Sequence, residues 1–417
     1  PSLAAAAALG LTLASPIQAP AAATTPDWNQ WRGPHRDAIL RNAAPWPKSL
    51  APDRLQRTWR VPLGPSYSGP LVTGDRVFTT ESRENTTESV IAFDRATGRE
   101  VWRHSWEGFM KVPFFARANG DWIRATPALS DGRLYVGGMR DVLVCLDAAS
   151  GAEVWRFDFP RQLETALPSF GFVSSPLVHD GSVYVQAGGG FARLDAATGK
   201  LLWRTLDDGG GMWGSAFSSP VLTTLAGTPQ LLVQTRDKLA AVSPADGVVL
   251  WQHAIKAFRG MNILTPVPVG DMLFTSAYGG QTQGWKLGRT GQARTALEEQ
   301  WHLKLEGYMS TPVVIDGHAY LHTRPQRLVC VEVATGSKRW ESDDKYGKYM
   351  SLVANGTDIL ALDQRGILYL IDASPAALRI RDERRLTDSE TWAHLAVRGD
   401  QLAVREQDAL AVWTWTP

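Results

Sequence analysis

Cysteine is scarce in this sequence, and the short strings that mark common catalytic sites are missing. Only two of the 417 residues are cysteine, and no CxxCH string offers a haem attachment point. There is no GxSxG, HExxH or phosphate-binding P-loop, no GxGxxG in a strand–helix–strand context, and the eight histidines lack metal-ligand spacing. The sequence therefore gives no support to hydrolase, nucleotide-binding or metalloenzyme chemistry.

A strong charge of either sign is also absent. The 43 Lys and Arg residues almost balance the 42 Asp and Glu residues, so the formal net charge is +1. A protein with this balance has no long-range electrostatic attraction to nucleic acid or to an anionic membrane. We expect no nucleic-acid partner.

Long hydrophobic runs are limited to the beginning of the sequence. The apolar stretch at 3–14 is too short to span a bilayer, and small residues suited to cleavage after Ala19 or Ala23 follow it. We expect residues 1–23 to be an export signal, with a disordered Ala/Pro tail as the alternative, and the protein to be periplasmic or secreted. A basic segment and an initiator Met are missing, so we expect the sequence to start inside the signal, which leaves lipid anchoring open.

Glycine, proline and tryptophan are abundant, with 38, 25 and 17 residues, which favours short strands joined by many turns. Aligning the sequence with itself shows a repeated string, Asp-x-x-Thr/Ser-Gly-x-x-x-Trp, in three clear and two weaker copies. In all five copies Gly precedes Trp by four residues. The copies end at Trp102, Trp155, Trp203, Trp251 and Trp340.

A second string precedes each copy: two small residues, Pro, an apolar run and a turn, as in "SSPLVHDGSVY" from Ser174. Counting looser versions, there are eight units spaced 40 to 57 residues apart. Each unit contains four short strands with alternating apolar residues, and no crossover helix separates the units. In the turn of the first string, Asp is placed to accept backbone N–H bonds two residues on, and Gly supplies positive φ.

Repeated four-stranded antiparallel units of this length predict an all-β fold, an eight-bladed β-propeller around a central channel. The last unit stops after its third strand at 409–415, and a lone fourth-strand sequence stands at 55–63. We therefore predict that this N-terminal strand completes the C-terminal blade and closes the ring. The predicted organisation is a lead-in segment at 24–54 followed by a single propeller domain at 55–417.

The repeats also predict which residues surround one mouth of the channel. The position three before the motif Pro is apolar or aromatic in seven units and Arg124 in the second, while the position just before Pro is small except for His394. An aromatic mouth with a few charges suits a ligand or a peptide. The alternative is that the aromatics pack between blades and Arg124 pairs with Asp121. The candidate mouth residues are Arg124, Trp122, Phe172, Trp213, Arg259, Asn262, Tyr308, Trp392 and His394.

The five repeated tryptophans have a different interpretation. Their fixed register after Gly indicates structural docking between blades rather than carbohydrate stacking. One insertion, at 106–122, is apolar, aromatic and basic together. We expect it to cover a face of the propeller, with recruitment of a partner as the alternative.

The strings ending in Trp resemble the tryptophan-docking motif of the pyrroloquinoline-quinone (PQQ)-like repeat propellers, and the likeness spans roughly 55–415. The opening "DWNQWRGPHRDAIL" at 27–40 also resembles the lead-in of exported members of this group. The resemblance implies two possible occupations within the quinoprotein alcohol dehydrogenase-like superfamily. One is a PQQ-dependent dehydrogenase that uses Ca²⁺. The other is a non-enzymatic factor of the BamB type in outer-membrane protein assembly.

A dehydrogenase of that kind would need adjacent cysteines above the quinone, a Trp floor, carboxylate and amide ligands for Ca²⁺, and a catalytic Asp. Cys145 and Cys330 belong to units two and six, on opposite sides of the predicted ring and beyond disulfide reach. We therefore favour a monomeric periplasmic scaffold without cofactor, metal or catalytic residues, whose protein partners include barrel-assembly components. The alternatives are a divergent PQQ-dependent alcohol or sugar dehydrogenase and a small-molecule or glycan receptor.

Overall fold

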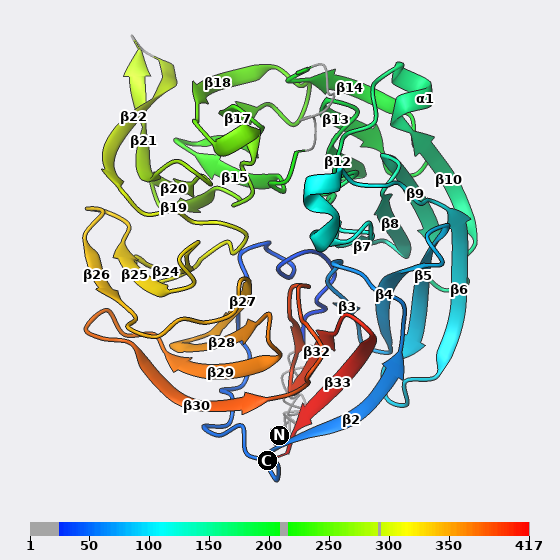
Figure 1. Cartoon of the computed structure of the whole chain (residues 1–417). Helices are drawn as coiled ribbons and strands as arrows, with labels where there is room; N and C mark the ends of the chain where they lie inside the picture. The colour runs from blue at the N-terminus through cyan, green and yellow to red at the C-terminus, as the bar shows by residue number, and fades with distance from the viewer. Residues whose placement is uncertain (1–24, 209–215, 291–292, 417) are drawn as a thin grey trace, which may run out of the picture.

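Eight blades, each an antiparallel sheet of four strands, surround a central axis (Figure 1), which confirms the predicted eight-bladed propeller. The computed structural model describes residues 25–208, 216–290 and 293–416. The predicted export signal lies outside these residues. In blades 1 to 7 the strands run outward from the channel in chain order, whereas in blade 8 the outermost strand comes from the N-terminal part of the chain. Strand β1 (Ile39–Leu40) adds a parallel strand to the innermost strand of blade 7.

The first four blades follow one another directly in the chain. From the channel outward, blade 1 contains β3 (Leu71–Val72), β4 (Arg76–Arg83), β5 (Thr87–Asp94) and β6 (Glu100–Glu107), and blade 2 contains β7 (Ala128–Ser130), β8 (Arg133–Gly138), β9 (Val142–Asp147) and β10 (Glu153–Asp158). Blade 3 contains β11 (Leu177–His179), β12 (Ser182–Ala187), β13 (Gly190–Asp195) and β14 (Leu201–Thr205). Blade 4 contains β15 (Val221–Leu225), β16 (Thr228–Gln234), β17 (Lys238–Val242) and β18 (Val249–Ala254).

Blades 5 to 8 complete the circle. Blade 5 contains β19 (Val267–Val269), β20 (Met272–Ser276), β21 (Thr282–Thr290) and β22 (Ala293–Leu303), and blade 6 contains β23 (Val313–Ile315), β24 (His318–His322), β25 (Leu328–Glu332) and β26 (Lys338–Glu341). Blade 7 contains β27 (Met350–Asn355), β28 (Asp358–Asp363), β29 (Ile367–Asp372) and β30 (Arg379–Arg385). Blade 8 contains β31 (Ala396–Arg398), β32 (Gln401–Arg405), β33 (Ala409–Trp415) and, as its outermost strand, β2 (Leu55–Pro62). Within the described residues, three short helices interrupt the strands: η1 (Phe114–Asn119), α1 (Phe159–Leu163) and η2 (Phe258–Gly260).

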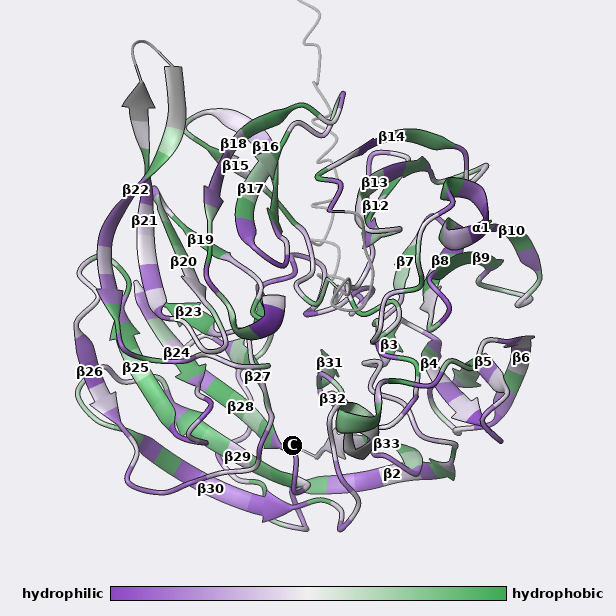
Figure 2. Ribbon diagram, turned by 45° about the horizontal axis from the view of Figure 1, so that its top comes forward, coloured by the Kyte–Doolittle hydropathy of each residue, from purple (hydrophilic) through white to green (hydrophobic). Residues whose placement is uncertain are grey.

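The core lies between the blades. Because every sheet is packed between two neighbours, both faces of the inner strands are buried; in β9, for example, all residues except the last are buried. The outermost strands carry exposed polar residues, and Figure 2 shows hydrophilic residues on strands such as β26 and β30. Cys145 in β9 and Cys330 in β25 are buried in blades 2 and 6.

The ring closes as predicted. Strand β2 pairs antiparallel with β33, from Leu55 opposite Trp415 to Pro62 opposite Ala409. The Arg60 guanidinium binds the buried carboxylate of Glu406 at 2.9 Å, so the joint has an ion pair as well as a ladder. The closing strand leaves no open edge inside the last blade.

The repeated Asp-x-x-Thr/Ser-Gly turn connects the third and fourth strands. In blade 1, Asp94 Oδ1 accepts hydrogen bonds from the backbone N and the hydroxyl of Thr97, at 2.9 and 2.7 Å. The Asp94 carboxylate therefore accepts the N–H of the residue three positions after it, and not two positions after it as we had expected. Gly98, the residue after Thr97, has the positive φ of 71° that the turn requires. These bonds lower the Asp94 pKa. A Cβ at Gly98 would lie 2.7 Å from the Trp59 indole of blade 8, so only Gly allows this contact.

Three of the five predicted docking tryptophans lie on the glycine turn of the next blade. Trp102, Trp155 and Trp203 pack on Gly151, Gly199 and Gly247. The indole N–H donates to a carbonyl of the next blade in three of the five predicted residues: Trp102 to Ala148, Trp155 to Ala196 and Trp340 to Ser374.

Trp251 is different, because its N–H donates at 2.8 Å to Gln230 in its own blade. Blade 5, which follows, has a long β21–β22 hairpin in place of the glycine turn. The alignment also missed two tryptophans with the same geometry: Trp59 donates to Arg95 and Trp301 to Val333.

The lead-in segment closes one end of the channel. Figure 1 shows it, in blue, crossing the centre of the ring. Trp28 forms a β-bridge with Val72 of blade 1, Asn29 bonds Leu129 of blade 2, and Ala38 accepts from Ala354 of blade 7. All three partners lie in innermost strands, at the end remote from the predicted mouth residues. We call this end the base.

Candidate functional site

The residues three before the motif Pro, which the alignment of the repeats predicted to surround the mouth, line one central cavity. Its walls contain the residue three before the motif Pro from all eight blades. The eight are Tyr67, Arg124, Val173, Phe217, Ile263, Met309, Tyr349 and Trp392. The cavity has a volume of about 210 Å³ and opens at the end opposite the lead-in segment, which we call the mouth.

Trp31 of the lead-in segment forms the floor of the cavity next to His394. The His394 ring lies between Trp28 and Trp31, with both ring centroids 6.3 Å away. Its Nδ1–H donates to the Leu395 carbonyl at 2.8 Å, which leaves Nε2 as an acceptor in the neutral ring. Burial and the nearby Arg32 lower the His394 pKa to about 3, so the ring is uncharged at neutral pH.

Two arginines support the floor from below. Arg32 donates to the carbonyls of Thr311 and Pro312 in blade 6 and of Asp37, and Arg36 donates to Ser175 and Pro176 in blade 3. Both guanidiniums are buried and pack over the Trp31 ring at 5.6 and 5.4 Å. Burial lowers the Arg32 pKa to about 10 and the Arg36 pKa to about 9, so both remain charged at neutral pH.

Arg124 is the charged residue in the wall. Its guanidinium lies over the Tyr67 ring at 5.1 Å and donates to the Gly120 carbonyl at 2.7 Å. Burial lowers the Arg124 pKa and raises the Tyr67 pKa to about 12, so at neutral pH the arginine is charged and the tyrosine protonated. Asp121, the alternative partner we had considered, accepts a hydrogen bond from the Val112 backbone N–H, and its charge opposes the lowering of the Arg124 pKa.

The small residues before the motif Pro have a structural role. In successive blades, the hydroxyl of one residue accepts the backbone N–H of its equivalent in the blade before. The chain of bonds runs from Gly69 to Thr126, Ser175, Ser219, Thr265 and Thr311, at 2.9–3.1 Å. We call these residues the hydroxyl belt. It links blades 1 to 6 around the cavity and satisfies N–H groups that would otherwise be buried without a partner.

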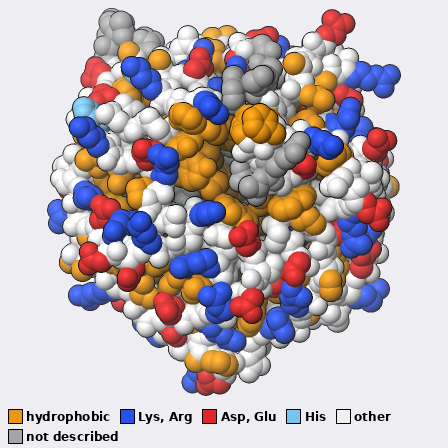
Figure 3. All heavy atoms as spheres, viewed as in Figure 1, with side chains coloured by type: hydrophobic (Ala, Val, Ile, Leu, Met, Phe, Trp, Pro, Cys, Tyr) orange, Lys and Arg blue, Asp and Glu red, His pale blue; other side chains and the backbone are white. Residues whose placement is uncertain are grey.

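Exposed aromatic side chains surround the mouth. Phe114, Phe115 and Phe258 are 79%, 45% and 46% exposed, and the Arg259 guanidinium lies over Phe115 and Phe258 at 5.7 and 5.0 Å. We call these four residues the rim. Figure 3 shows hydrophobic side chains gathered around the centre of this face. The insertion that carries η1 is anchored by the buried Val112 and Ala116.

Five of the nine predicted mouth residues lie at the cavity or its rim. Arg124, Tyr308, Trp392 and His394 line the cavity, and Arg259 belongs to the rim. Phe172 and Asn262 do not line it: Phe172 packs on Gly137 in the blade core, and the Asn262 amide donates to the carbonyls of Thr235 and Arg236. Trp213 lies outside the described residues.

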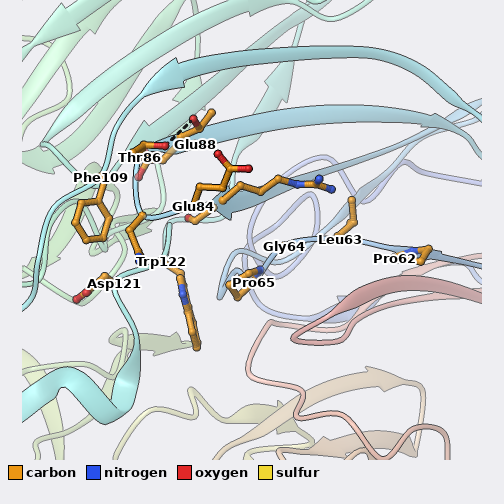
Figure 4. A pocket seen from close by; sticks show the side chains of 14 residues that line it. Pro62, Leu63, Gly64, Pro65, Glu84, Thr86, Glu88, Phe109, Asp121 and Trp122 are labelled. Atoms are coloured by element: carbon orange, nitrogen blue, oxygen red, sulfur yellow. Dashed lines mark hydrogen bonds between the residues drawn. The ribbon is translucent and has the colours of Figure 1, made fainter.

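Trp122 lines a neighbouring groove. This groove has a volume of about 470 Å³ and lies between the segment after β2 and the turn between β4 and β5. Figure 4 shows Pro65 from that segment and Glu84 from that turn, together with Phe109, Asp121 and Trp122. The Trp122 ring is 5.3 Å from the Tyr67 ring, so these two aromatics separate the groove from the cavity.

The floor was missed because the lead-in segment is outside the repeats. Internal alignment ranks positions by their equivalents in other blades, and Trp31, Arg32 and Arg36 have none. The signal that was available is "WRGPHR" at 31–36, where two arginines flank a Gly-Pro pair. Arg32 and Arg36 both take positive φ, 61° and 58°, which few residues other than Gly adopt.

Comparison with known proteins identifies the family. The family model described as outer membrane protein assembly factor BamB matches residues 49–117 and 86–342. The chain belongs to this family. The BamB protein of Shewanella oneidensis is 24% identical over 304 residues, covering 69% of this chain and 70% of the relative. The crystal structure of BamB from Moraxella catarrhalis has a TM-score of 0.64 and 18% identity, covers 87% of this chain and 98% of its own, and shows the same fold.

A dehydrogenase is also similar over part of the chain. The polyvinylalcohol dehydrogenase of a Sphingopyxis species is 27% identical over 218 residues, which are 46% of this chain and 31% of the relative. The cavity does not suit the quinone and Ca²⁺ of that superfamily. Its described lining contains no Asp, Glu, Asn or Gln, although Ca²⁺ needs several such oxygens. Its volume is also below the roughly 300–1,000 Å³ usual for cofactor-sized ligands.

Proposed function

We propose that this protein is a periplasmic binding scaffold that takes part in the assembly of outer-membrane proteins. The observation that carries the proposal is the match of the BamB family model to most of the propeller, 49–117 and 86–342. The printed names of the BamB relatives give them that role, and two of them match over 69% and 79% of this chain. The misfit between the cavity lining and the quinone cofactor also favours a scaffold over a dehydrogenase.

The mouth face is the surface we assign to partner binding. The mouth face presents three exposed phenylalanines next to an arginine, and both residue types are enriched in protein interfaces. Exposed apolar side chains on the outer strands, such as Ile380 in β30, stand on other faces. The periplasmic location follows from the predicted export signal. None of the described helices is long and apolar enough to cross a bilayer.

Site-specific photo-crosslinking in a Gram-negative host tests this function. A photoreactive phenylalanine analogue is placed at Phe114 on the rim or at Ile380 on the outer strand, two exposed apolar positions. We expect the Phe114 form to crosslink to a barrel-assembly component and the Ile380 form to give at most a weak product. Equal products at both positions, or none at Phe114, would contradict the assignment of the mouth face.

Loss of the protein tests the same function independently. Deletion of its gene should lower the level of folded outer-membrane barrel proteins, and the wild-type chain should restore it. Purified protein mixed with PQQ and Ca²⁺ should show no change in quinone absorption and no dye-linked alcohol oxidation. Unchanged barrel levels together with alcohol oxidation would instead support the dehydrogenase.

A further inference from the structure

The shape of the cavity favours the end of a chain over a segment that passes through. Trp31 closes the base, so a ligand enters and leaves by the mouth alone. The volume of about 210 Å³ corresponds to about seven water molecules at about 30 Å³ each, and a cavity of about 150 Å³ is enough for benzene. One aromatic or large aliphatic side chain with the backbone group beside it fills such a space.

The charges select an anion. Arg124 is the only side chain charged at neutral pH in the described lining, because His394 is neutral and the tyrosines are protonated. Arg32 and Arg36 lie under the floor and bond carbonyls, so the charges of these two guanidiniums add to that of Arg124. Two carboxylates lie outside the lining but near this wall. The charge of Asp121 opposes the lowering of the Arg124 pKa by burial, and its carboxylate accepts the Val112 backbone N–H. Glu390, close to Tyr67, is bonded to the Trp392 indole and the Gln364 amide. An ammonium group would be repelled here, whereas a carboxylate would be held.

An apolar path connects the cavity with the rim. Phe115 contacts Phe170, and Phe170 contacts Phe217, with ring centroids 6.5 and 5.4 Å apart. Phe170 and Phe217 both line the cavity, whereas Phe115 is exposed at the mouth. A free aromatic acid would use the cavity alone. A polypeptide would also place the apolar residues before its last one on the rim.

We propose that the cavity binds the carboxyl-terminal residue of a polypeptide, with an apolar or aromatic side chain inside and the α-carboxylate on Arg124. The inference rests on the proposed function, since it names the part of a client or partner protein that the mouth face recognises. The rim then holds the residues that precede the terminus. The same chemistry occurs in free aromatic acids, and the experiment below separates the two sources.

Calorimetric titration of the purified chain tests the proposal with three probes. The first is an N-acetylated peptide of six residues that alternates apolar and polar residues and ends in Phe with a free carboxylate. The second is the same peptide ending in a carboxamide, and the third is 3-phenylpropanoate. We expect the free-acid peptide to bind at least tenfold more tightly than the amide and than 3-phenylpropanoate.

Two arginine variants show whether Arg124 causes that preference. Arg124→Gln should bring the acid and amide peptides to equal affinity. Arg324→Gln is the matched control, because Arg324 also lies over a tyrosine, Tyr278 at 4.8 Å, but outside the cavity; it should keep the tenfold preference. Val173→Trp, which fills the cavity without touching a charge, should weaken both peptides at least tenfold. Thermal unfolding establishes that each variant is folded.

Several outcomes would overturn the proposal. Equal affinity of acid and amide for the wild-type chain would exclude carboxylate recognition. Binding of 3-phenylpropanoate as tight as that of the peptide would assign the cavity to a small acid. If the Arg324→Gln variant loses the preference as well, Arg124 is not the cause. These failures can be distinguished from failure of the proposed function by expressing Arg124→Gln in the deletion strain. If that variant still restores the level of folded barrel proteins, the scaffold role stands and the failure concerns the carboxylate inference alone.

Discussion

The two ends of the propeller bury groups that titrate in different pH ranges. The base holds the guanidiniums of Arg32 and Arg36, bonded to carbonyls, and both stay charged throughout the physiological range. The mouth end holds the carboxyl groups of Glu88 and Asp141, which bond backbone N–H groups of the next blade, and burial raises both pKa values to about 7. The base is thus closed independently of pH, whereas the loops at the mouth respond to it.

Removing an arginine from the base should have the largest effect on stability. Arg32→Ala leaves the carbonyls of Thr311, Pro312 and Asp37 without their donor, at about 1–3 kcal/mol each. The lowered pKa of about 10 shows that burying this charge costs about 3 kcal/mol, which the substitution recovers. Together the three carbonyls cost about 3–9 kcal/mol, so after the recovered energy of about 3 kcal/mol the loss is up to about 6 kcal/mol in the free energy of unfolding, measured with urea.

Arg124→Gln at the mouth is the counterpart. Its guanidinium lies over an aromatic ring and bonds the carbonyl of Gly120 in a loop, so we expect a change within about 1 kcal/mol. Equal losses for Arg32→Ala and Arg124→Gln would mean that the base is not held more firmly than the mouth.

Glu88→Gln should make stability less dependent on pH, by about 3 kcal/mol. The folded-state pKa of about 7 lies above the unfolded value of 4.5, so the folded chain binds this proton more tightly. The contribution of Glu88 is therefore greatest below about pH 4.5 and is lost as the pH rises to about 7. Urea titrations between pH 4 and 8 should show that the free energy of unfolding falls less with rising pH in the variant than in the wild-type chain.

The control for this prediction is Glu84→Gln, an exposed glutamate in the neighbouring turn. It should retain the decline of the wild-type chain. A decline of the same size in the Glu88→Gln variant would show that Asp141 and other groups account for the pH dependence.

What could be predicted from the sequence follows the repeats. The turn geometry around Asp94 and Gly98 is local and recurs, so five copies were enough to predict the ring and the docking of Trp102 or Trp155. The cavity walls were also predictable, because equivalent positions in a closed ring face the same axis. The eight wall residues and His394 all came from alignment.

Contacts that occur once could not be predicted. Arg32 donates to backbone carbonyls about 280 residues away. Because every residue has such a carbonyl, the residue types do not indicate which carbonyls will accept these bonds. Trp251 repeats the docking string, yet the next blade lacks the glycine turn that would receive it. Phe172 and Asn262 precede a first strand, as the mouth residues do, but point into the blade.

The hydroxyl belt lies between the two ends, and its predicted effect is smaller than those of Arg32 and Glu88. Thr126→Val keeps the shape of the side chain and removes the acceptor of the Gly69 N–H, a buried bond of 2.9 Å between blades 1 and 2. An N–H left without a partner costs about 1–2 kcal/mol, which should appear as a lower urea midpoint with an unchanged slope. Thr79→Val is the matched control, because the buried Thr79 hydroxyl has no hydrogen-bond partner among the described residues, and its loss should change stability by less than about 0.5 kcal/mol. If the two variants lose stability equally, the cost comes from the Thr-to-Val replacement itself, and the belt does not hold the blades together.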